Sequence, residues 1–313
     1  MSGPRTVAVF TGECDVTADV VIIELGRRGV PVFRVDPAAF PAEMTMSARF
    51  DGTWSGRLRA GRRSVDVADV VCAWWRRPNP IAAPTGATEA EWTRSEAVAG
   101  FRGVLAVLPW LNHPDGIRAA EHKPWQLATA ARVGLKTVPT LITNDGAEAR
   151  AFAAAQNRIV YKPLTSGVLD DGRVVYARPV DPEVLDESIA VTAHLFQRQV
   201  PKSHELRVTV VDGRMFTARI DGLSELARQD WRADHSNVRY RADRLPDDVA
   251  ERVRRFLALG RLRFAALDFV VTPGGEHVFL EANPNGQWAW IEQETGLPIA
   301  AAIADALESG RHD

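Results

Sequence analysis

The sequence of 313 residues predicts a mixed α/β fold, with α+β character toward its C-terminus. Short apolar runs such as TVAVF (6–10) and DVVCAWW (69–75) alternate with helical patterns, and two strand hairpins with clear turns come later in the chain. An apolar fraction of 46% and a charged fraction of 25% exclude disordered, collagenous and coiled-coil classes. At roughly 100 to 200 residues per domain, the length favours two domains or one elaborate one.

The first part of the chain begins with a βαβ pattern, which predicts an N-terminal α/β domain over residues 1–118. Its expected elements are a strand at 6–10, a helix at 17–28, a strand at 31–36, a hairpin through 44–58, a strand at 69–75 and a helix at 89–108.

Two further units are expected, a central one over 119–195 and a C-terminal one over 196–313. The central unit has helical patterns at 117–133 and 145–156, strands at 138–143, 158–164, 174–180 and 194–200, and a helix starting at Asp181-Pro182. The C-terminal unit has two hairpins, 205–211 with 214–220 and 265–271 with 276–282, and flanking helices at 247–260 and 297–309.

Charge and cysteine content narrow the environment and the partners. Lys plus Arg number 38 against 40 Asp plus Glu, a formal net charge of -2, so neither nucleic acid nor a membrane is an expected partner. Cys14 and Cys72 are the two cysteines, which excludes a disulfide scaffold and favours a reducing cytoplasm. No apolar run fits a signal peptide or approaches the ~20 residues of a membrane span, so we expect a cytoplasmic protein.

The strongest local signal is LDFVVTPGGEHVFLEANPNG, residues 267–286. A hairpin turn centred on Gly274-Gly275 places Asp268 nearly opposite Glu281, and alternation along the strand puts Asn283 on the same face as Glu281. Three oxygen-bearing side chains then converge, as hard cations such as Mg²⁺ require. The alternative is a solvent-exposed carboxylate pair at the end of a strand.

Basic side chains supply the complementary signal. Lys123 lies near a helix start and Lys162 on an apolar strand, where a buried lysine needs an anionic partner unless its head reaches water. A turn at Asp212-Gly213 sets Arg207 against residue 218, so that Arg207 and Arg219 can point into neighbouring space. Guanidinium forks bind phosphate and carboxylate, although exposed arginines paired with nearby acids are the alternative.

These features in this order resemble the ATP-grasp superfamily of carboxylate–amine ligases, over about residues 110–309. The resemblance is carried by Lys123, Lys162, HLFQRQV, ELR, the ARI arginine, LDF and EANPNG. Four more segments are similar to the ATP-grasp ribosomal peptide maturases, the graspetide or microviridin-type macrocyclases: VCAWWRRP (71–78), WLNHPDGIRAAEHKPWQL (110–127), GLKTVPTLITN (134–144) and QDWR (229–232).

The resemblance implies an ATP-grasp fold with an N-terminal pre-ATP-grasp domain, an ATP- and Mg²⁺-dependent ligase, and a role for each matching residue. At the nucleotide, Lys123 and Lys162 would contact the phosphates, Glu205 would join the ATP site, and the hinge beside adenine would consist of Gln197, Arg198, Gln199 and Val200, with backbone groups of Arg198 and Val200 on the base. Mg²⁺ would be held by Asp268, Glu281 and Asn283, and the γ-phosphate and an acyl-phosphate would be stabilised by Arg207 and Arg219. The residues near the substrate would be Asp230, Arg232 and Arg239. The loop TSGVLDDG (165–172), at the position of a phosphate lid, is poor in glycine.

The implied reaction joins Asp or Glu side chains of a ribosomally made precursor peptide, with its leader and core, to Ser, Thr or Lys side chains as ω-ester or ω-amide macrocycles. A homodimer is a further expectation from the family. The alternatives are an ATP-grasp ligase that acts on small molecules or on a protein tail, and a noncatalytic peptide-binding module. Trp74 and Trp75 could line a peptide groove, but aromatic residues in an apolar strand are more often core.

Overall fold

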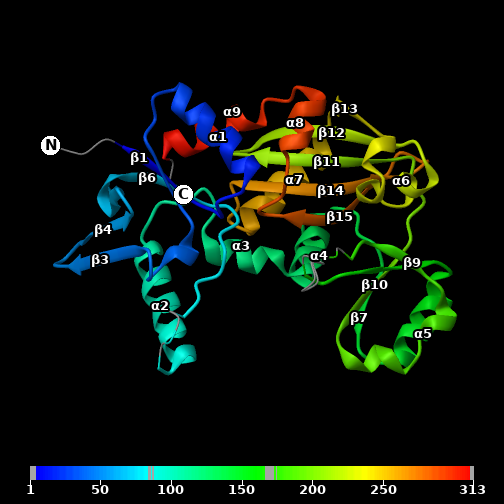
Figure 1. Cartoon of the computed structure of the whole chain (residues 1–313). Helices are drawn as coiled ribbons and strands as arrows, with labels where there is room; N and C mark the ends of the chain where they lie inside the picture. Colours follow the sequence, from blue (N-terminus) through cyan, green and yellow to red (C-terminus); the bar gives the residue numbers. More distant parts are fainter. Residues whose placement is uncertain (1–4, 84–85, 87, 166–172, 174, 311–313) are drawn as a thin grey trace.

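The N-terminal domain is built on a parallel three-stranded sheet with the strand order β2-β1-β6. A computed structural model describes residues 5–83, 86, 88–165, 173 and 175–310. The sheet consists of β1 (Thr6–Phe10), β2 (Val32–Val35) and β6 (Val70–Trp75), and α1 (Val16–Arg27) connects its first two strands. Asp15 caps α1 by accepting the amides of Thr17 and Ala18 at 3.1 and 3.2 Å. The predicted βαβ opening is confirmed (Figure 1).

A small antiparallel sheet extends from this domain, as the predicted hairpin required. Its strands are β3 (Met44–Phe50), β4 (Trp54–Ala60) and β5 (Arg63–Asp66), followed by the exposed helix α2 (Ala90–Leu105). The strand β5 was not predicted, because its sequence is mostly polar and charged and gives no apolar alternation. Its pairing depends on a turn at Gly61, whose φ of 56° suits glycine.

The helical pattern at 117–133 divides into two helices, α3 (Pro114–Glu121) and α4 (Lys123–Arg132). The prediction of one helix is wrong because Pro124 has no N–H to donate to the preceding turn, whereas proline is favourable in the first turn of a new helix. The break leaves His122 in an extended conformation and makes Lys123 the first residue of α4. Lys123 therefore projects from a helix start toward the C-terminal sheet.

The central unit is an antiparallel sheet in the order β7-β10-β8-β9, covered by α5 (Gly146–Gln156). The strands are β7 (Thr140–Thr143), β8 (Ile159–Lys162), β9 (Arg178–Val180) and β10 (His194–Arg198). The helix predicted from Asp181 is wrong: two short 3₁₀ turns, 182–184 and 187–191, stand there. The boundary predicted at 195 falls inside β10, which pairs with both β7 and β8.

The C-terminal unit is a five-stranded antiparallel sheet in the order β13-β12-β11-β14-β15. Its strands are β11 (His204–Val211), β12 (Arg214–Gly222), β13 (Val238–Asp243), β14 (Phe264–Val271) and β15 (His277–Asn283), and its helices are α6 (Glu225–Gln229), α7 (Asp247–Leu259), α8 (Ala289–Thr295) and α9 (Ile299–Ser309). One face packs on α7. The other meets α8 and α9, and α9 also packs on α1, so a single core joins this sheet to the N-terminal domain (Figure 1).

Other sequence expectations are tested by burial. Trp74 is 2% exposed in the core shared by α1 and α9, and Trp75 is half-buried against the aromatic cluster around Phe10, so the core interpretation of both is confirmed. Both cysteines are free thiols. Within the described ranges, every helix is too short or too polar to cross a bilayer.

Candidate active site

The hairpin of β14 and β15 places the predicted carboxylates opposite each other. Asp268 pairs with Glu281 and Ala266 with Asn283, so the three predicted metal ligands share one face of the sheet. The next pair is Phe269 with Phe279, which leaves Leu280 as an extra residue in a bulge beside the carboxylates. The predicted turn is also present, with Gly275 at a φ of 81°. The predicted pairing of Asp268 with Glu281 is therefore confirmed, and the role of the three residues as metal ligands stays a prediction.

Asp268 is 4% exposed and its charge is balanced by two arginines. Arg207 donates from Nη1 to both carboxylate oxygens, at 2.8 and 2.9 Å, and Arg232 donates from Nη2 to Oδ2 at 2.7 Å. The Arg207 side chain is as buried as its partner, and its Nη2 also donates to the backbone oxygen of Gln287 at 3.0 Å. Buried charges of this kind persist only when paired, so the arrangement is tightly determined.

Glu281 lies under a group of cations that both predicted lysines join. Lys123 Nζ donates to Glu281 Oε2 at 3.0 Å, and Arg232 Nη2 lies 3.7 Å from Oε1. Burial raises the pKa of Glu281, but the positive charges of Lys123, Lys162 and Arg232 hold it well below its usual range. Burial lowers the pKa of Lys162, and attraction to Glu281 opposes that shift. Positive charge thus exceeds negative charge here, as an anionic ligand requires.

Arg219 does not lie beside Arg207. The register confirms that Arg207 pairs with Ala218, but Arg219 pairs with Leu206, so the two arginines project from opposite faces of the sheet. Arg219 binds its own neighbour, with Nε 2.9 Å from Asp221 Oδ1. The expectation that they share one space is wrong, because strand alternation separates residues 207 and 219 once the turn is set. The catalytic role of Arg219 stays a prediction.

The QDWR segment supplies the second arginine of the site. Asp230 is buried, accepts the amide of Arg232 at 3.0 Å, and so turns the chain in a way that directs Arg232 to Asp268. The Arg232 guanidinium lies 4.5 Å from the ring centre of Trp231, a cation–π contact that further fixes it. Arg239 is exposed on β13 and does not join them. Sequence similarity placed Arg232 near the substrate, but only the fold brings it to the carboxylates.

The predicted adenine hinge runs from the end of β10 to Val200. Gln197 is buried and its Nε2 donates to Thr140 Oγ1 at 3.0 Å. The amide of Arg198 donates to Pro139 O at 3.0 Å, and the amide of Gln199 donates to Arg158 O at 2.9 Å. Because the amide of Arg198 already donates to Pro139 O, the predicted contact of Arg198 with the base would use its backbone carbonyl. The predicted lid TSGVLDDG lies, after Thr165, outside the described residues.

Glu205 lies on the face of Arg207 and pairs with Lys202, 2.5 Å from Nζ. Burial raises its pKa, and Lys202 opposes the shift. Because the folded state holds a proton at this carboxyl more tightly than the unfolded state, stability falls as pH rises from the unfolded value, about 4.3, through the raised folded value. We expect a Glu205→Gln variant to gain stability relative to wild type across this window. Urea unfolding at a series of pH values measures the difference, and a difference independent of pH contradicts the prediction.

Sequence reasoning missed the part that the N-terminal domain plays. Arg76 is fully buried and donates to the backbone oxygen of Asn285 and, at 2.6 Å, to Gln287 Oε1, while its Nε lies 3.4 Å from Asp15 Oδ2. Gln287 in turn accepts from Arg207 through its backbone oxygen. The glycine in this loop is required, since a Cβ at Gly286 would lie 2.4 Å from Ala266 Cβ and 3.0 Å from Arg207 Nη2. The WWRRP motif, which contains Arg76, is the sequence signal that could have indicated this role.

An Arg76→Lys variant tests this link. Lysine keeps the charge but lacks the fork that reaches both the 285 carbonyl and Gln287, so we expect the free energy of unfolding to fall by about 2 kcal/mol. Chemical denaturation of the variant and of wild type provides the measurement. Unchanged stability would show that the loop from 284 to 287 does not depend on Arg76.

Two buried amides were also missed. Gln126 of α4 donates to Ala282 O and accepts from Ala282 N, at 2.7 and 2.9 Å, which ties α4 to β15 beside Glu281. Asn112 accepts the amides of Arg263 and Phe264 and donates to Pro284 O at 3.1 Å. Both occur in the motif of residues 110–127, and a buried amide beside a strand end gives no sequence signal of its own. They hold the hairpin that carries the metal ligands.

The donor set suits Mg²⁺. Asp268, Glu281 and Asn283 offer hard oxygen atoms, and Asn283 Oδ1, which accepts the amide of Asn285 at 2.9 Å, keeps a second lone pair. Among the described residues, no three His, Cys, Asp or Glu side chains are grouped to hold a metal ion. Lys123 and Arg232 balance the carboxylates in this structure.

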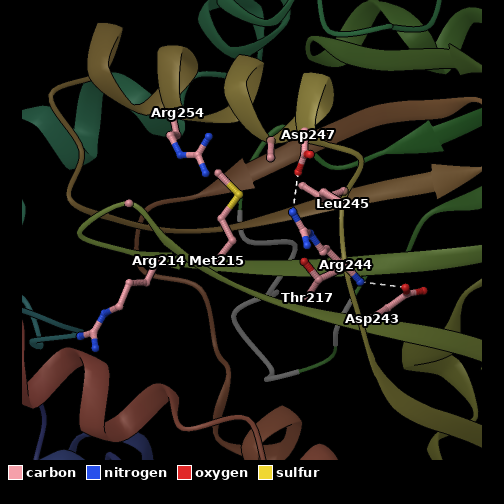
Figure 2. Close-up of a pocket in the computed structure, with 10 residues that line it drawn as sticks. Arg214, Met215, Thr217, Asp243, Arg244, Leu245, Asp247 and Arg254 are labelled. Atoms are coloured by element: carbon pink, nitrogen blue, oxygen red, sulfur yellow. Dashed lines mark hydrogen bonds and ion pairs between the residues drawn. The ribbon is translucent and has the colours of Figure 1, made fainter.

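A pocket of about 420 Å³ lies on the other face of the same sheet (Figure 2). It is lined by Met215 and Thr217 of β12, by Leu245 between β13 and α7, and by Arg254 of α7, among others. The pocket residues on the strands lie on the same face of the sheet as Arg219, and Arg207 lies on the opposite face. The pocket is therefore separate from the carboxylates.

Comparisons with known proteins agree with this geometry. A family model described as the MvdD pre-ATP grasp domain matches residues 7–112. A search of curated protein sequences gave no match. A RiPP-associated ATP-grasp ligase from Chryseobacterium gregarium, solved with ADP and a leader and core peptide, has a TM-score of 0.86, 26% identity and coverage of 98% of both chains.

Two macrocyclases from Microcystis aeruginosa MRC are also similar. MdnC, solved with its precursor peptide MdnA, has a TM-score of 0.85 and 28% identity, and MdnB has 0.80 and 33%; each alignment covers 97% of this chain and 99% of the other. The predicted ATP-grasp fold with its N-terminal pre-ATP-grasp domain is confirmed. An identity of 33% over almost the whole chain shows that it belongs to the ATP-grasp ribosomal peptide maturases, the graspetide macrocyclase family of MdnB.

Proposed function

We propose that this ATP-dependent peptide ligase phosphorylates Asp or Glu side chains of a ribosomal precursor peptide and joins them to Ser, Thr or Lys side chains as ω-ester or ω-amide macrocycles. Family membership supports the ligase activity, and relatives solved with ADP and with leader and core or precursor peptides support both ATP and a peptide as substrates. ADP and phosphate would be released.

The observation that carries the proposal is the facing pair Asp268 and Glu281, which accept hydrogen bonds from Arg207, Arg232 and Lys123. A carboxylate is a poor electrophile. Transfer of the γ-phosphoryl group converts it into an acyl-phosphate, which has a good leaving group. Asp268, Glu281 and Asn283 would hold Mg²⁺, which would supply positive charge to the transferred phosphoryl group. Lys123 and Lys162 orient the phosphates from α4 and β8, and Arg207 holds a fixed positive charge where negative charge develops.

Arg232 is proposed to act at the substrate side of the phosphates. Its guanidinium donates to Asp268, lies 3.7 Å from Glu281 Oε1 and is held on the face of the Trp231 ring, so it is fixed beside both carboxylates. Holding both reacting side chains of one peptide in the same site then makes the attack intramolecular, with the rate gain of proximity.

We also propose a cytoplasmic homodimer without nucleic-acid or membrane partners. The net charge of -2 and the two free thiols support this environment. Light scattering on the purified chain measures the mass in solution, and a monomer contradicts the dimer.

Incubation of candidate precursors with the chain, ATP and Mg²⁺ tests the function. MdnA and short peptides encoded beside the gene for this chain are suitable candidates. Intact mass spectrometry should show loss of one water per link, dependent on ATP. ATP consumption with a small amino acid or a protein tail but with no precursor would favour the alternative acceptor.

A further inference from the structure

The side chain of Arg77 reaches the loop beside the site and, among the described residues, forms no ion pair with a carboxylate. It follows Arg76 directly after β6, and its backbone oxygen accepts the amide of Gly12 at 3.0 Å, which fixes the chain at this point. Its Nη2 lies 3.4 Å from Asn285 O, in the loop that follows the predicted metal ligand Asn283. The guanidinium therefore lies beside the loop of residues 285–287, whose Gln287 oxygen accepts from Arg207.

The other site arginines are already matched with acids. Arg76 lies 3.4 Å from Asp15, Arg207 lies 2.8 Å from Asp268, and Arg232 lies 2.7 Å from Asp268. For Arg77, no carboxylate in the described part of the chain comes within 4.0 Å. Asp15 and Glu121 attract it from farther away, while burial and the nearby Arg207 lower its pKa. Arg77 is exposed, so its guanidinium is accessible to an anionic ligand that enters the site.

We propose that Arg77 binds the side-chain carboxylate of the precursor peptide that is to be activated, an inference that rests on the proposed ligase function. The proposed function assigns Lys123, Lys162 and Arg207 to the phosphates, so a further accessible cation beside the loop of residues 285–287 suits the second anionic reactant. A guanidinium fork binds both oxygens of a carboxylate. It rejects an amide, which offers a single acceptor oxygen and turns an N–H₂ group toward the arginine. Arg77 thus selects Asp and Glu over Asn and Gln.

A double-mutant cycle tests the contact. The enzyme is wild type or Arg77→Ala, and the probe is a precursor that wild type dehydrates, either intact or with its reacting acid replaced by the amide. Calorimetry with Mg²⁺ and AMPPNP measures binding without turnover. We expect the amide to weaken binding to wild type about tenfold or more, and to make no difference to Arg77→Ala. An amide effect of the same size in both enzymes would overturn the proposal.

A second arm needs no precursor and separates this inference from the proposed function. N-acetyl-L-glutamate α-methylamide carries the side-chain carboxylate as its single charge, and ligand-observed NMR measures its binding to the chain with Mg²⁺ and AMPPNP. We expect about tenfold weaker binding to Arg77→Ala and wild-type binding to Arg59→Ala, an exposed arginine of β4 that serves as the matched control. Equal binding to Arg77→Ala and wild type, or none to wild type, would overturn the role of Arg77. Failure of every precursor with normal probe binding would overturn only the macrocyclase function.

Discussion

A Glu281→Gln variant is expected to lose ligase activity, with kcat at least about a thousandfold lower than wild type. Glutamine has nearly the same shape, but it removes the negative charge that binds Lys123 and that would hold Mg²⁺ opposite Asp268. The lysine then lacks its anchor and the metal lacks a charged ligand. Initial rates of water loss from the precursor, measured by mass spectrometry at saturating ATP, give the comparison.

The matched control is Glu276→Gln, at the turn of the same hairpin. Glu276 is an exposed acid at the hairpin turn that pairs with Lys136. Its loss should leave the rate unchanged, because exposed ion pairs contribute little. If Glu281→Gln keeps more than about a tenth of the wild-type rate, Glu281 is not a ligand of the catalytic metal.

The second large effect is expected for Arg207→Met, in both stability and activity. Removing one partner of the buried pair leaves Asp268 with Arg232 alone, and the free energy of unfolding should fall by about 3–5 kcal/mol. Loss of the donor to Gln287 O also frees the loop that Arg76 holds. Guanidinium-chloride unfolding measures the stability, and ADP release in the presence of precursor measures the activity.

A second variant separates stability from catalysis. Replacing both partners, as Arg207→Met with Asp268→Leu, removes the buried charges together, so much of the lost stability should return while activity remains absent. Arg214→Met, on the exposed start of β12, is the control for loss of an arginine and should change stability by less than about 1 kcal/mol. A single Arg207→Met variant as stable as wild type would contradict the assigned role of the pair.

Local chemistry explains what the sequence could predict. The pairing of Asp268 with Glu281 depends on a short turn within one hairpin, so alternation alone placed Asn283 with them. The same reasoning predicted Arg207 opposite residue 218, and side-chain alternation then places Arg219 on the opposite face of the sheet.

The remaining site contacts are long-range. Arg232 reaches Asp268 across 36 residues, and Arg76 reaches the loop after β15 across more than 200. No local periodicity reports such contacts. The first depends on how the segment between β12 and β13 folds back on the C-terminal sheet, and the second depends on how α9 packs that sheet on the N-terminal domain. The break before Lys123 is a local feature that Pro124 could have indicated, and it decides where that lysine points.

The central claim is that a precursor carboxylate is activated by phosphorylation between the central sheet and the C-terminal sheet. The most direct measurement uses a precursor whose Asp and Glu side chains carry isotopically heavy oxygen, followed by mass analysis of the phosphate released during cyclisation. Attack of the carboxylate on the γ-phosphate predicts one heavy oxygen in phosphate for each link formed, and none in the adenine nucleotide. Heavy oxygen in AMP, or phosphate without the label while links still form, would contradict the account.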